Sequence, residues 1–320
     1  MRVIYRGQVF EAEIHELARR RGLDFVIARD EQELLRELPG ADALWITPTF
    51  YQPAVPQAVK AELGRLKWIG LTSAGYDVLL RAGVPPGVTM TYAVTVHAPA
   101  VAEHAVALLL ALVRQLPRAI TAQVNADWNS PAMVNSLRSL EDLTVAIVGL
   151  GSIGGSVAER LRPLAKRISG VSRSGHADAR VDEVFASTRL HDALAQSDVV
   201  ILTVSFTEET RHMIDAAALA VMPANGLVVN VSRGPVVDGA ALHRALAEGR
   251  LAGAALDVTE PEPLPAGDPL WHTPGVIVTP HIAAFGSRAT GRRLADQYER
   301  NIDRFARGET LEGTIALPTL

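Results

Sequence analysis

The sequence predicts an α/β fold with two parallel sheets, each covered by helices on both faces. Three observations lead to this fold class. Short apolar runs alternate with helical patterns over residues 1–97, and the same alternation resumes after residue 143. The third is an apolar strand in the second region that runs directly into a glycine-rich turn opening a helix. We therefore expect two Rossmann-like, doubly wound domains.

Length and composition limit the kinds of protein that the chain can be. At 320 residues, 48% hydrophobic and 21% charged, it is long enough for two cores. A net charge of −4 gives no basic surface for nucleic acid or an anionic membrane. Since there is no cysteine, disulfides and thiolate chemistry are excluded. The longest apolar run, 105–113, is too short to span a bilayer. We expect a cytoplasmic protein without a nucleic-acid or membrane partner.

The first 97 residues are expected to form a parallel sheet covered by helices. The apolar runs predict strands at Val3–Tyr5, Asp24–Ala28, Ala43–Thr47, Trp68–Thr72 and Val88–Tyr92. Helical patterns lie between them, for example at Glu11–Arg21 and Glu31–Leu38. The next stretch, Ala100–Gln115, is apolar on nearly every face, which predicts a helix buried between domains or subunits.

The alternation returns after a polar segment, 116–142, that shows no clear strand. Later strands are predicted at Val145–Val148, Arg167–Val171, Val199–Val204, Leu227–Val231, Ala254–Asp257 and Val276–Thr279. The helices between them are predicted at Ser152–Leu164, His191–Ala195, Ala216–Val221 and Gly239–Glu248. A final helix, Ser287–Arg307, has an apolar stripe and is expected to pack back on the first domain.

The glycine-rich turn has the pattern G-x-G-x-x-G within Val145–Gly154. Gly149 allows a tight turn, Gly151 lets backbone N–H groups approach phosphates, and Gly154 lets the helix pack close to the strand. The first helical turn, with Ser152 and Ile153, then directs its N–H groups at an anion. This context predicts a dinucleotide pyrophosphate site, and the alternative is a purely structural glycine turn.

The end of the second strand predicts which dinucleotide is bound. A carboxylate at this position would bind the ribose 2′-OH of NAD, but the sequence reads Ser172-Arg173-Ser174. Arg173 can bind a 2′-phosphate through two parallel hydrogen bonds, and both serine hydroxyls can donate to it. We predict NADP(H) in preference to NAD(H); the alternative is that Arg173 is a solvated loop cation.

Three residues with suitable chemistry follow later strands, where ligands bind in open α/β sheets. Arg233 can bind a substrate carboxylate. His281 can give a proton to a carbonyl oxygen and take it back, and Glu262 can orient its imidazole. Spacing alone leaves Glu260 as a rival to Glu262. Together the three predict reversible 2-hydroxy-acid oxidation; taken singly, each has a structural interpretation, such as a helix-cap arginine or a packed histidine ring.

No metal site is predicted. His97 and His104 flank the apolar helix, and neither has a partner at metal-ligand spacing.

The chain resembles the D-isomer-specific 2-hydroxyacid dehydrogenase family over essentially its whole length. The resemblance rests on the motifs at Val101–His104, Val148–Gly154, Thr207–Ile214, Asn230–Asp238, Asp257–Pro263 and Thr279–His281. It selects Glu262 over Glu260. It also implies a discontinuous, flavodoxin-like substrate domain of residues 1–97 plus 286–320, an inserted dinucleotide domain of residues 98–285, and catalysis in the cleft between them.

The resemblance further implies binding residues and an assembly. Backbone N–H groups of Ser73, Ala74 and Gly75 would bind the substrate carboxylate, together with Arg233 and His281. Asp257 would lie near the nicotinamide amide. Further cofactor contacts are expected at Val204, Ser205, Thr210, Val231, Arg233, His281 and Ala283. Members are usually homodimers built through the nucleotide domain, which suits residues 116–140 as an arm over the partner.

Within the family, the NADP-type Arg173 resembles glyoxylate/hydroxypyruvate reductases. We expect an enzyme that reduces a small 2-keto acid to its D-2-hydroxy acid. One alternative is an NAD(P)-sensing, non-enzymatic regulator on the same fold. Another is a phosphoglycerate-type or phosphite-type dehydrogenase.

Overall fold

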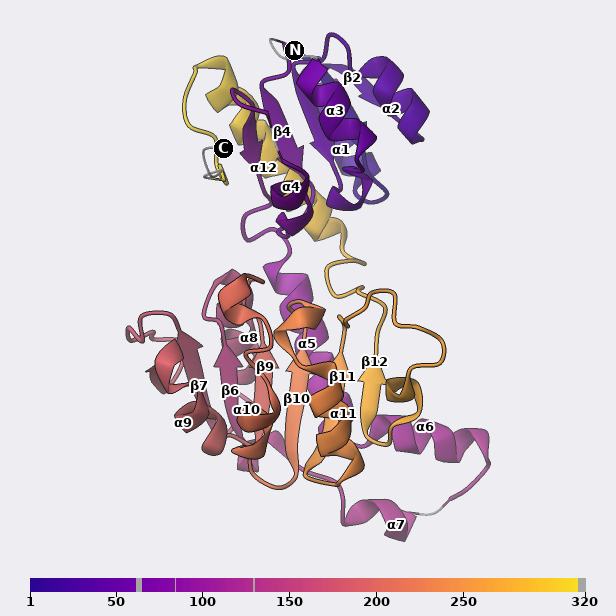
Figure 1. Ribbon diagram of the computed structural model, residues 1–320, viewed down its shortest axis with the longest axis vertical. Helices are drawn as coiled ribbons and strands as arrows, with labels where there is room; N and C mark the ends of the chain where they lie inside the picture. Colours follow the sequence, from indigo (N-terminus) through magenta and orange to yellow (C-terminus); the bar gives the residue numbers. More distant parts are fainter. Residues whose placement is uncertain (62–64, 84, 129, 316–320) are drawn as a thin grey trace. The chain divides into compact units, whose positions relative to one another are not determined.

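The computed structural model describes residues 1–61, 65–83, 85–128 and 130–315. The chain forms two compact units (Figure 1). Unit 1 consists of Met1–His97 and Phe285–Leu320, and unit 2 consists of Ala98–Ala284, so unit 2 is inserted between the two segments of unit 1.

Unit 1 contains a five-stranded parallel sheet. Its strands are β1 (Arg2–Arg6), β2 (Asp24–Ile27), β3 (Ala43–Ile46), β4 (Trp68–Leu71) and β5 (Thr89–Thr91). Their order is β2-β1-β3-β4-β5. This is the order of flavodoxin-like sheets, in which ligands bind beyond the carboxyl ends of the strands.

Helices cover both faces of the unit 1 sheet. They are α1 (Glu11–Arg20), α2 (Glu31–Glu37), α3 (Ala54–Ala61), α4 (Asp77–Ala82) and α12 (Arg288–Ala306). Strand side chains alternate between the faces: Tyr5 packs with residues of α1 and α12, whereas Ile4 packs with residues of α2 and α3. The last helix therefore completes the core of unit 1, as the sequence predicts.

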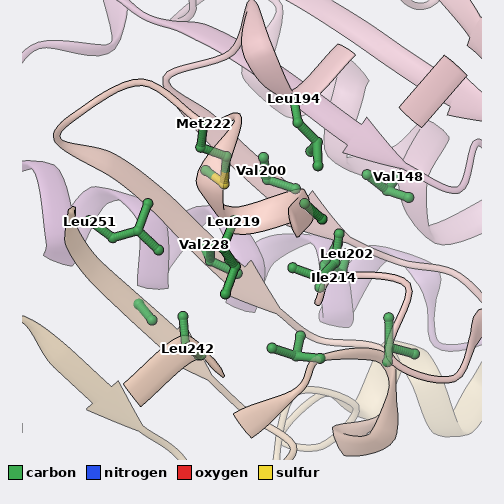
Figure 2. Close-up of a cluster of buried hydrophobic side chains, with 14 of the residues drawn as sticks. Val148, Leu194, Val200, Leu202, Ile214, Leu219, Met222, Val228, Leu242 and Leu251 are labelled. Atoms are coloured by element: carbon green, nitrogen blue, oxygen red, sulfur yellow. The ribbon is translucent and has the colours of Figure 1, made fainter. Parts of the chain in front are cut away.

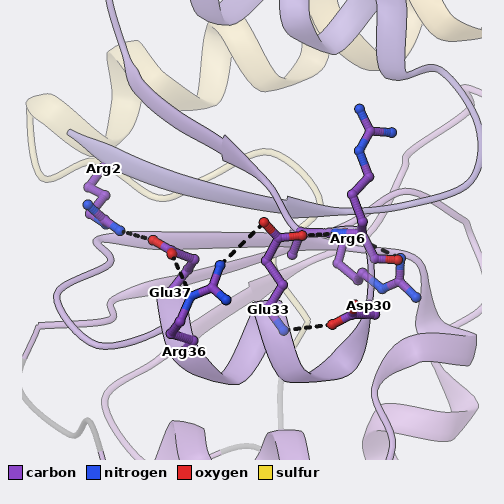
Figure 3. A network of polar contacts seen from close by, with 8 residues as sticks. Arg2, Arg6, Asp30, Glu33, Arg36 and Glu37 are labelled. Carbon is purple, nitrogen blue, oxygen red and sulfur yellow. Dashed lines mark hydrogen bonds and ion pairs between the residues drawn. The ribbon is translucent and has the colours of Figure 1, made fainter.

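Polar contacts on unit 1 define where α2 begins and join it to the sheet (Figure 3). The Asp30 carboxylate accepts a hydrogen bond from the Glu33 amide at 2.7 Å and caps the helix. At the other end of α2, Glu37 lies 2.7 Å from Arg2 of β1. Such partly exposed ion pairs contribute at most about 1 kcal/mol, so the buried helix face supplies most of the stability.

Unit 2 contains a seven-stranded parallel sheet. Its strands are β6 (Thr144–Val148), β7 (Arg167–Ser172), β8 (Glu183–Ala186), β9 (Val199–Leu202), β10 (Gly226–Asn230), β11 (Leu251–Leu256) and β12 (Val276–Val278). Their order is β12-β11-β10-β9-β6-β7-β8. This is the dinucleotide-binding order with one added strand, and the order reverses between β6 and β9. The predicted fold class is confirmed.

The helices of unit 2 also lie on both faces of its sheet. They include α5 (Ala98–Val113), α8 (Ser152–Leu161), α9 (Leu190–Ala195), α10 (Ala216–Ala220) and α11 (Gly239–Ala247). Figure 2 shows one face, where Val148, Val200 and Val228 of the strands pack against Leu219 and Leu242 of α10 and α11. The intervening strand residues pack against α5 and α8 on the other face. Helix α5 confirms that this region forms a largely buried helix; that it lies between domains or subunits stays a prediction.

The segment predicted to lack strands forms helices. It contains α6 (Leu116–Val124) and α7 (Ser130–Val134), followed by a short 3-10 turn at Leu140–Asp142 (Figure 1). Over the part of the chain that the structure describes, no single helix could span a membrane. Helices α5 and α6 taken together have the length and apolar composition of a membrane span, but the chain bends by 64° between them.

Candidate active site

The glycine turn follows β6, at the point where the strand order reverses. Gly149 has φ +103°, and a Cβ there would lie 2.9 Å from the Val204 amide. A Cβ on Gly154 would lie 1.9 Å from the Gly149 carbonyl oxygen. Only glycine fits these two positions. The Thr203 hydroxyl donates to that same carbonyl at 2.7 Å and so holds the turn. Thr203 did not stand out in the sequence, because its partner lies 54 residues away.

The turn leaves room for an anion. A Cβ added to Gly151 would meet nothing within 4 Å. Among the described residues, no side chain caps the amino end of α8, which starts at Ser152. The N–H groups of Ser152 and Ile153 are thus placed where helix geometry leaves donors for a ligand, and the helix dipole favours negative charge there. The open space and the uncapped donors fit a pyrophosphate.

The predicted selectivity residues lie at the end of β7, of which Ser172 is the last residue and which Arg173 and Ser174 follow. The Gly175 amide donates to the Ser172 hydroxyl at 3.1 Å, and the His176 amide donates to the Ser174 hydroxyl at 3.4 Å. Both hydroxyls therefore accept within the loop and keep their own protons to donate. Arg173 is exposed, and its side chain forms no hydrogen bond or ion pair with another described residue.

A second arginine from the same loop reaches the glycine turn. Arg180 donates to the Leu150 carbonyl at 3.2 Å and to the Asp178 carboxylate at 2.8 Å. This side-chain hydrogen bond lowers the pKa of Asp178 to about 2. Asp178 is thereby engaged by Arg180, and the loop folds back toward the glycine turn.

The loop after β9 contains three further predicted cofactor contacts. Val204 packs against the unit 2 core. The Thr210 hydroxyl accepts from the Thr207 amide at 2.8 Å and donates to the Ser205 carbonyl at 3.0 Å. Thr210 therefore closes this loop and positions Val204 and Ser205.

Arg233 follows β10 and is held by a buried asparagine. The Asn230 amide group donates to the Arg233 carbonyl at 3.0 Å, and its oxygen accepts from the Ser232 amide and hydroxyl. Val231 between them is buried. A Cβ on Gly234 would lie 1.9 Å from the Thr259 carbonyl oxygen, so the arginine loop packs directly against the loop after β11. Asn230 lies in one of the sequence motifs but is not among the predicted site residues.

His281 and Glu262 form a pair. His281 Nδ1 lies 3.0 Å from Glu262 Oε2, and both side chains are about half exposed. With Nδ1 donating to the carboxylate, Nε2 is left to exchange a proton with a ligand. Glu260 instead contacts Arg211 at 3.2 Å and His212 at 3.3 Å. Sequence spacing left Glu260 and Glu262 as alternatives for the contact with His281, and in the structure Glu262 makes it.

Asp257 lies buried at the end of β11, beneath the histidine loop. Its carboxylate accepts from the Thr279 hydroxyl at 2.6 Å and from the Ile282 and Ala283 amides at 3.0 Å. Burial opposes ionisation, but these hydrogen bonds and one from His104 outweigh it and lower the pKa of Asp257 to about 2. Asp257 is therefore an ionised anchor for the residues after β12.

These residues gather at one edge of the unit 2 sheet. Strands β10, β11 and β12 are parallel neighbours, and they are followed by Arg233, Glu262 and His281. The glycine turn and Arg173 follow β6 and β7 at the same edge, because carboxyl ends of parallel strands lie together. This edge holds a nucleotide-binding turn, a guanidinium, and an imidazole oriented by a carboxylate.

The predicted substrate loop lies in unit 1, after β4. The Ser73 hydroxyl donates to the Gly75 carbonyl at 3.0 Å, and the Ser73 carbonyl accepts from the Ala93 amide at 3.0 Å. Ser73, Ala74 and Gly75 are half-buried. Their role in binding a substrate carboxylate stays a prediction.

A cavity of about 890 Å³ lies at the opposite edge of the unit 2 sheet. It is lined by the first residues of β11 and β12, Leu251 and Val276, and by α6 residues such as Arg118. None of the predicted site residues lines it. Within residues 1–61, 65–83, 85–128 and 130–315, no group of three or more acidic or histidine side chains could hold a metal ion.

Comparison with known proteins assigns the family. Residues 106–283, more than half of the chain, match the model described as D-isomer specific 2-hydroxyacid dehydrogenase, NAD binding domain. The chain belongs to this family. It is therefore an NAD(P)-dependent dehydrogenase that acts on a CH–OH group and uses a nicotinamide cofactor.

Several members of the family are similar over most of their length. A glyoxylate reductase from Thermofilum pendens is 34% identical over 283 residues, which span 87% of this chain and 82% of the relative. A D-3-phosphoglycerate dehydrogenase from Archaeoglobus fulgidus is 31% identical over 100% of this chain and 60% of the relative.

Solved structures of the family agree with the fold. A D-isomer specific 2-hydroxyacid dehydrogenase family protein from Aeromonas salmonicida has a TM-score of 0.87 and 31% identity over 99% of both chains. A family member from Xanthobacter autotrophicus, in complex with NADPH and MES, has a TM-score of 0.82 and 30% identity over 98% of this chain and 97% of its own.

Proposed function

We propose that this dehydrogenase reduces a small 2-keto acid of the glyoxylate or hydroxypyruvate type to the D-2-hydroxy acid, with NADP(H) preferred over NAD(H). The observation that carries the proposal is the His281–Glu262 pair, at 3.0 Å, on the sheet edge that also presents Arg233. The small substrate is supported by a relative named glyoxylate reductase.

The residues at the carboxyl edge of unit 2 would hold the cofactor. The open glycine turn and the amino end of α8 would bind the pyrophosphate. Arg173, with Ser172 and Ser174, would bind a ribose 2′-phosphate; NADPH bound to the Xanthobacter relative supports this choice. Unit 2 would then be the dinucleotide domain and unit 1 the substrate domain. When bound, the reduced nicotinamide supplies the hydride.

The side chains of the site carry out the remaining steps. Arg233 binds the substrate carboxylate through two charge-assisted hydrogen bonds and so fixes the position of C2. His281 starts as the imidazolium, with Nδ1–H directed at Glu262, and transfers the Nε2 proton to the carbonyl oxygen as C2 accepts the hydride. The products are the 2-hydroxy acid, neutral His281 and the oxidised cofactor. Glu262 orients the ring through its contact with Nδ1.

A second candidate substrate comes from the comparisons. The Archaeoglobus relative is named D-3-phosphoglycerate dehydrogenase, and phosphoglycerate carries the same 2-hydroxy-acid group. The same three side chains would act on it. The candidates differ in the group attached to C2, which is hydrogen in glyoxylate, a hydroxymethyl group in hydroxypyruvate and a phosphorylated, negatively charged hydroxymethyl group in phosphoglycerate.

We also propose that the protein is a homodimer through unit 2. The described part of the arm, residues 116–128 and α7, exposes apolar side chains, with Val124 80% and Trp128 95% accessible. Exposed apolar surface of this kind is typical of protein interfaces. The arm lies in unit 2, outside the sheet edge that carries the candidate site.

A substrate panel tests the proposed function. Purified protein is mixed with NADPH or NADH and with glyoxylate, hydroxypyruvate, larger 2-keto acids or, in the oxidative direction, 3-phosphoglycerate. Absorbance at 340 nm is followed. We expect the highest kcat/KM for glyoxylate or hydroxypyruvate with NADPH. Fastest turnover of 3-phosphoglycerate would contradict the substrate class, and cofactor binding without any turnover would indicate a nucleotide-sensing regulator instead.

A further inference from the structure

His104 lies outside the proposed catalytic set, on helix α5, yet it contacts the loop that carries His281. Its Nε2 atom is 3.1 Å from the Thr279 hydroxyl and 3.4 Å from Asp257 Oδ1. The His104 side chain is only 21% exposed. Helix α5 covers the face of the sheet to which β10 and β11 contribute. A side chain of a core helix therefore reaches the ends of β11 and β12.

The direction of the hydrogen bonds can be assigned from the number of protons available. The Asp257 carboxylate is ionised and can only accept. The Thr279 hydroxyl has one proton, and its 2.6 Å contact with Asp257 Oδ1 uses it. Towards His104, the hydroxyl can therefore only accept. It follows that His104 carries a proton on Nε2, which is directed at the Thr279 hydroxyl and at the neighbouring Asp257 carboxylate oxygen.

Asp257 in turn shapes the backbone around His281. The Asp257 carbonyl accepts from the His281 amide at 2.8 Å, and its carboxylate accepts from the next two amides, those of Ile282 and Ala283. His281 has φ +54°, a left-handed conformation that side-chain-bearing residues rarely adopt. The hydrogen bonds to Asp257 maintain this conformation, from which the His281 ring meets Glu262.

We propose that His104 is a positioning residue for catalysis. The chain of hydrogen bonds from His104 through Thr279 to Asp257 holds the His281 backbone so that Nδ1 stays on Glu262 and Nε2 stays available for the substrate oxygen. Because His104 acts through His281, this inference rests on the function proposed above. His104 itself contacts neither substrate nor cofactor in this scheme.

Two substitutions of His104 and a matched control test the proposal. His104→Leu removes the donor and should lower kcat about tenfold, the lower end of the range for residues that orient catalytic groups. KM for the keto acid and Kd for NADPH should change by no more than about twofold, because Arg233 and the glycine turn are untouched. His104→Gln keeps an N–H donor at the same reach and should recover most of the lost kcat.

The control is His243→Leu. His243 also contacts a threonine hydroxyl, with its Nδ1 atom 3.3 Å from Thr273 Oγ1, but Thr273 precedes β12 whereas Thr279 follows it. This substitution should leave kcat unchanged. An equal loss of kcat in both leucine variants, or a rise in KM and Kd in place of the fall in kcat, would overturn the proposal.

A double-mutant cycle separates this inference from the proposed function. In a His281→Ala background, His104→Leu should lower the residual turnover by no more than about twofold, because the group it positions is gone. An undiminished tenfold effect would overturn the role of His104 and leave that of His281 intact. A fully active His281→Ala enzyme would overturn the proposed function, and this inference with it.

The proton assignment can be measured without turnover. Long-range 1H–15N correlation spectra of the 15N-histidine-labelled protein distinguish the two imidazole tautomers, and the spectrum of His104→Gln identifies the His104 signals. We expect Nε2 to be protonated at neutral pH. A ring protonated only on Nδ1 would overturn the proposal even if the leucine variant fails to fold.

Discussion

At the scale of single residues, the candidate site consists of groups whose positions are set by buried neighbours. Asn230 uses both ends of its amide to shape the chain before Arg233. Asp257 uses its backbone carbonyl and its carboxylate to shape the chain at and after His281. Both neighbours are at most 2% exposed, whereas His281 and Glu262 are accessible to a ligand. Rigid support beneath exposed functional groups is what a preorganised site requires.

Replacing His281 tests its proposed role directly. His281→Ala should lower turnover about 10²–10⁴-fold, because proton transfer to the carbonyl oxygen is lost. Kd for the cofactor, measured by fluorescence titration, should stay nearly unchanged, since the glycine turn is intact. His212→Ala is a suitable control, because that histidine contacts Glu260 rather than Glu262. Undiminished turnover would remove His281 from the mechanism.

Arg173 should decide between the two cofactors. Arg173→Ala is expected to weaken NADPH binding about 10- to 100-fold, through loss of a charge-assisted phosphate contact worth about 1.5–3 kcal/mol. NADH binding should change little. Arg189→Ala is a control, because this exposed arginine pairs with Asp192 three residues away. Tighter binding of NADH than NADPH by the unmodified protein would contradict the preference.

The lowered pKa of Asp257 predicts how stability depends on pH. Its folded pKa of about 2 lies below the ordinary aspartate pKa of about 3.9, so the ionised carboxylate stabilises the fold above about pH 4. That contribution, about 2 kcal/mol, is lost as pH falls toward 2. In urea denaturation, Asp257→Asn should be less stable than the unmodified protein at pH 7, and the difference should shrink near pH 3. A difference that is constant with pH would contradict this assignment.

At the scale of elements, the glycine turn contains glycines that serve two different purposes, close packing and space for a ligand, which the sequence motif alone does not distinguish. Gly154 is needed for packing, because a Cβ would collide with the Gly149 carbonyl, whereas Gly151 faces open space. Both glycines belong to the same motif, yet of these two only Gly154 is required by the packing of the fold.

Two alanine substitutions should therefore behave differently. Gly154→Ala should destabilise the protein by about 1–3 kcal/mol, since backbone must move. Gly151→Ala should leave stability within about 0.5 kcal/mol and weaken cofactor binding, because the methyl group occupies the space proposed for the pyrophosphate. Thermal unfolding and fluorescence titration of both variants measure the two effects. Equal losses of stability would refute the distinction.

Sequence reasoning predicted most of the strands because their apolar runs are long and continuous. It missed β8, Glu183–Ala186, because this edge strand is short and mostly half-buried. It placed Arg233, Glu262 and His281 after consecutive strands, since parallel topology brings such positions to one edge. It did not find the contacts of Thr203 or His104, because hydrogen-bond partners 54 and 175 residues apart leave no local pattern.

At the scale of the whole molecule, the exposed arm predicts the state of assembly. A double substitution, Val124→Asp with Trp128→Asp, should convert the proposed dimer into a monomer, because two charges would be buried in the interface. Light scattering after size-exclusion chromatography gives the mass. Leu164→Asp, at another partly exposed apolar position, should leave the mass unchanged. A monomeric unmodified protein would contradict the dimer.

Because unit 2 is inserted into unit 1, the nascent chain on the ribosome completes unit 1 late. The strands that supply Tyr5 and Trp45 lie in the first segment of unit 1, but α12, which covers them, is translated only about 190 residues after that segment ends at His97. At 5–20 residues per second this delay is roughly 10–40 s. During this time the aromatic face of the unit 1 sheet lacks α12, the helix that covers it. A chain truncated just before α12 would contain all of unit 2 but would leave the aromatic face of the unit 1 sheet without the helix that covers it.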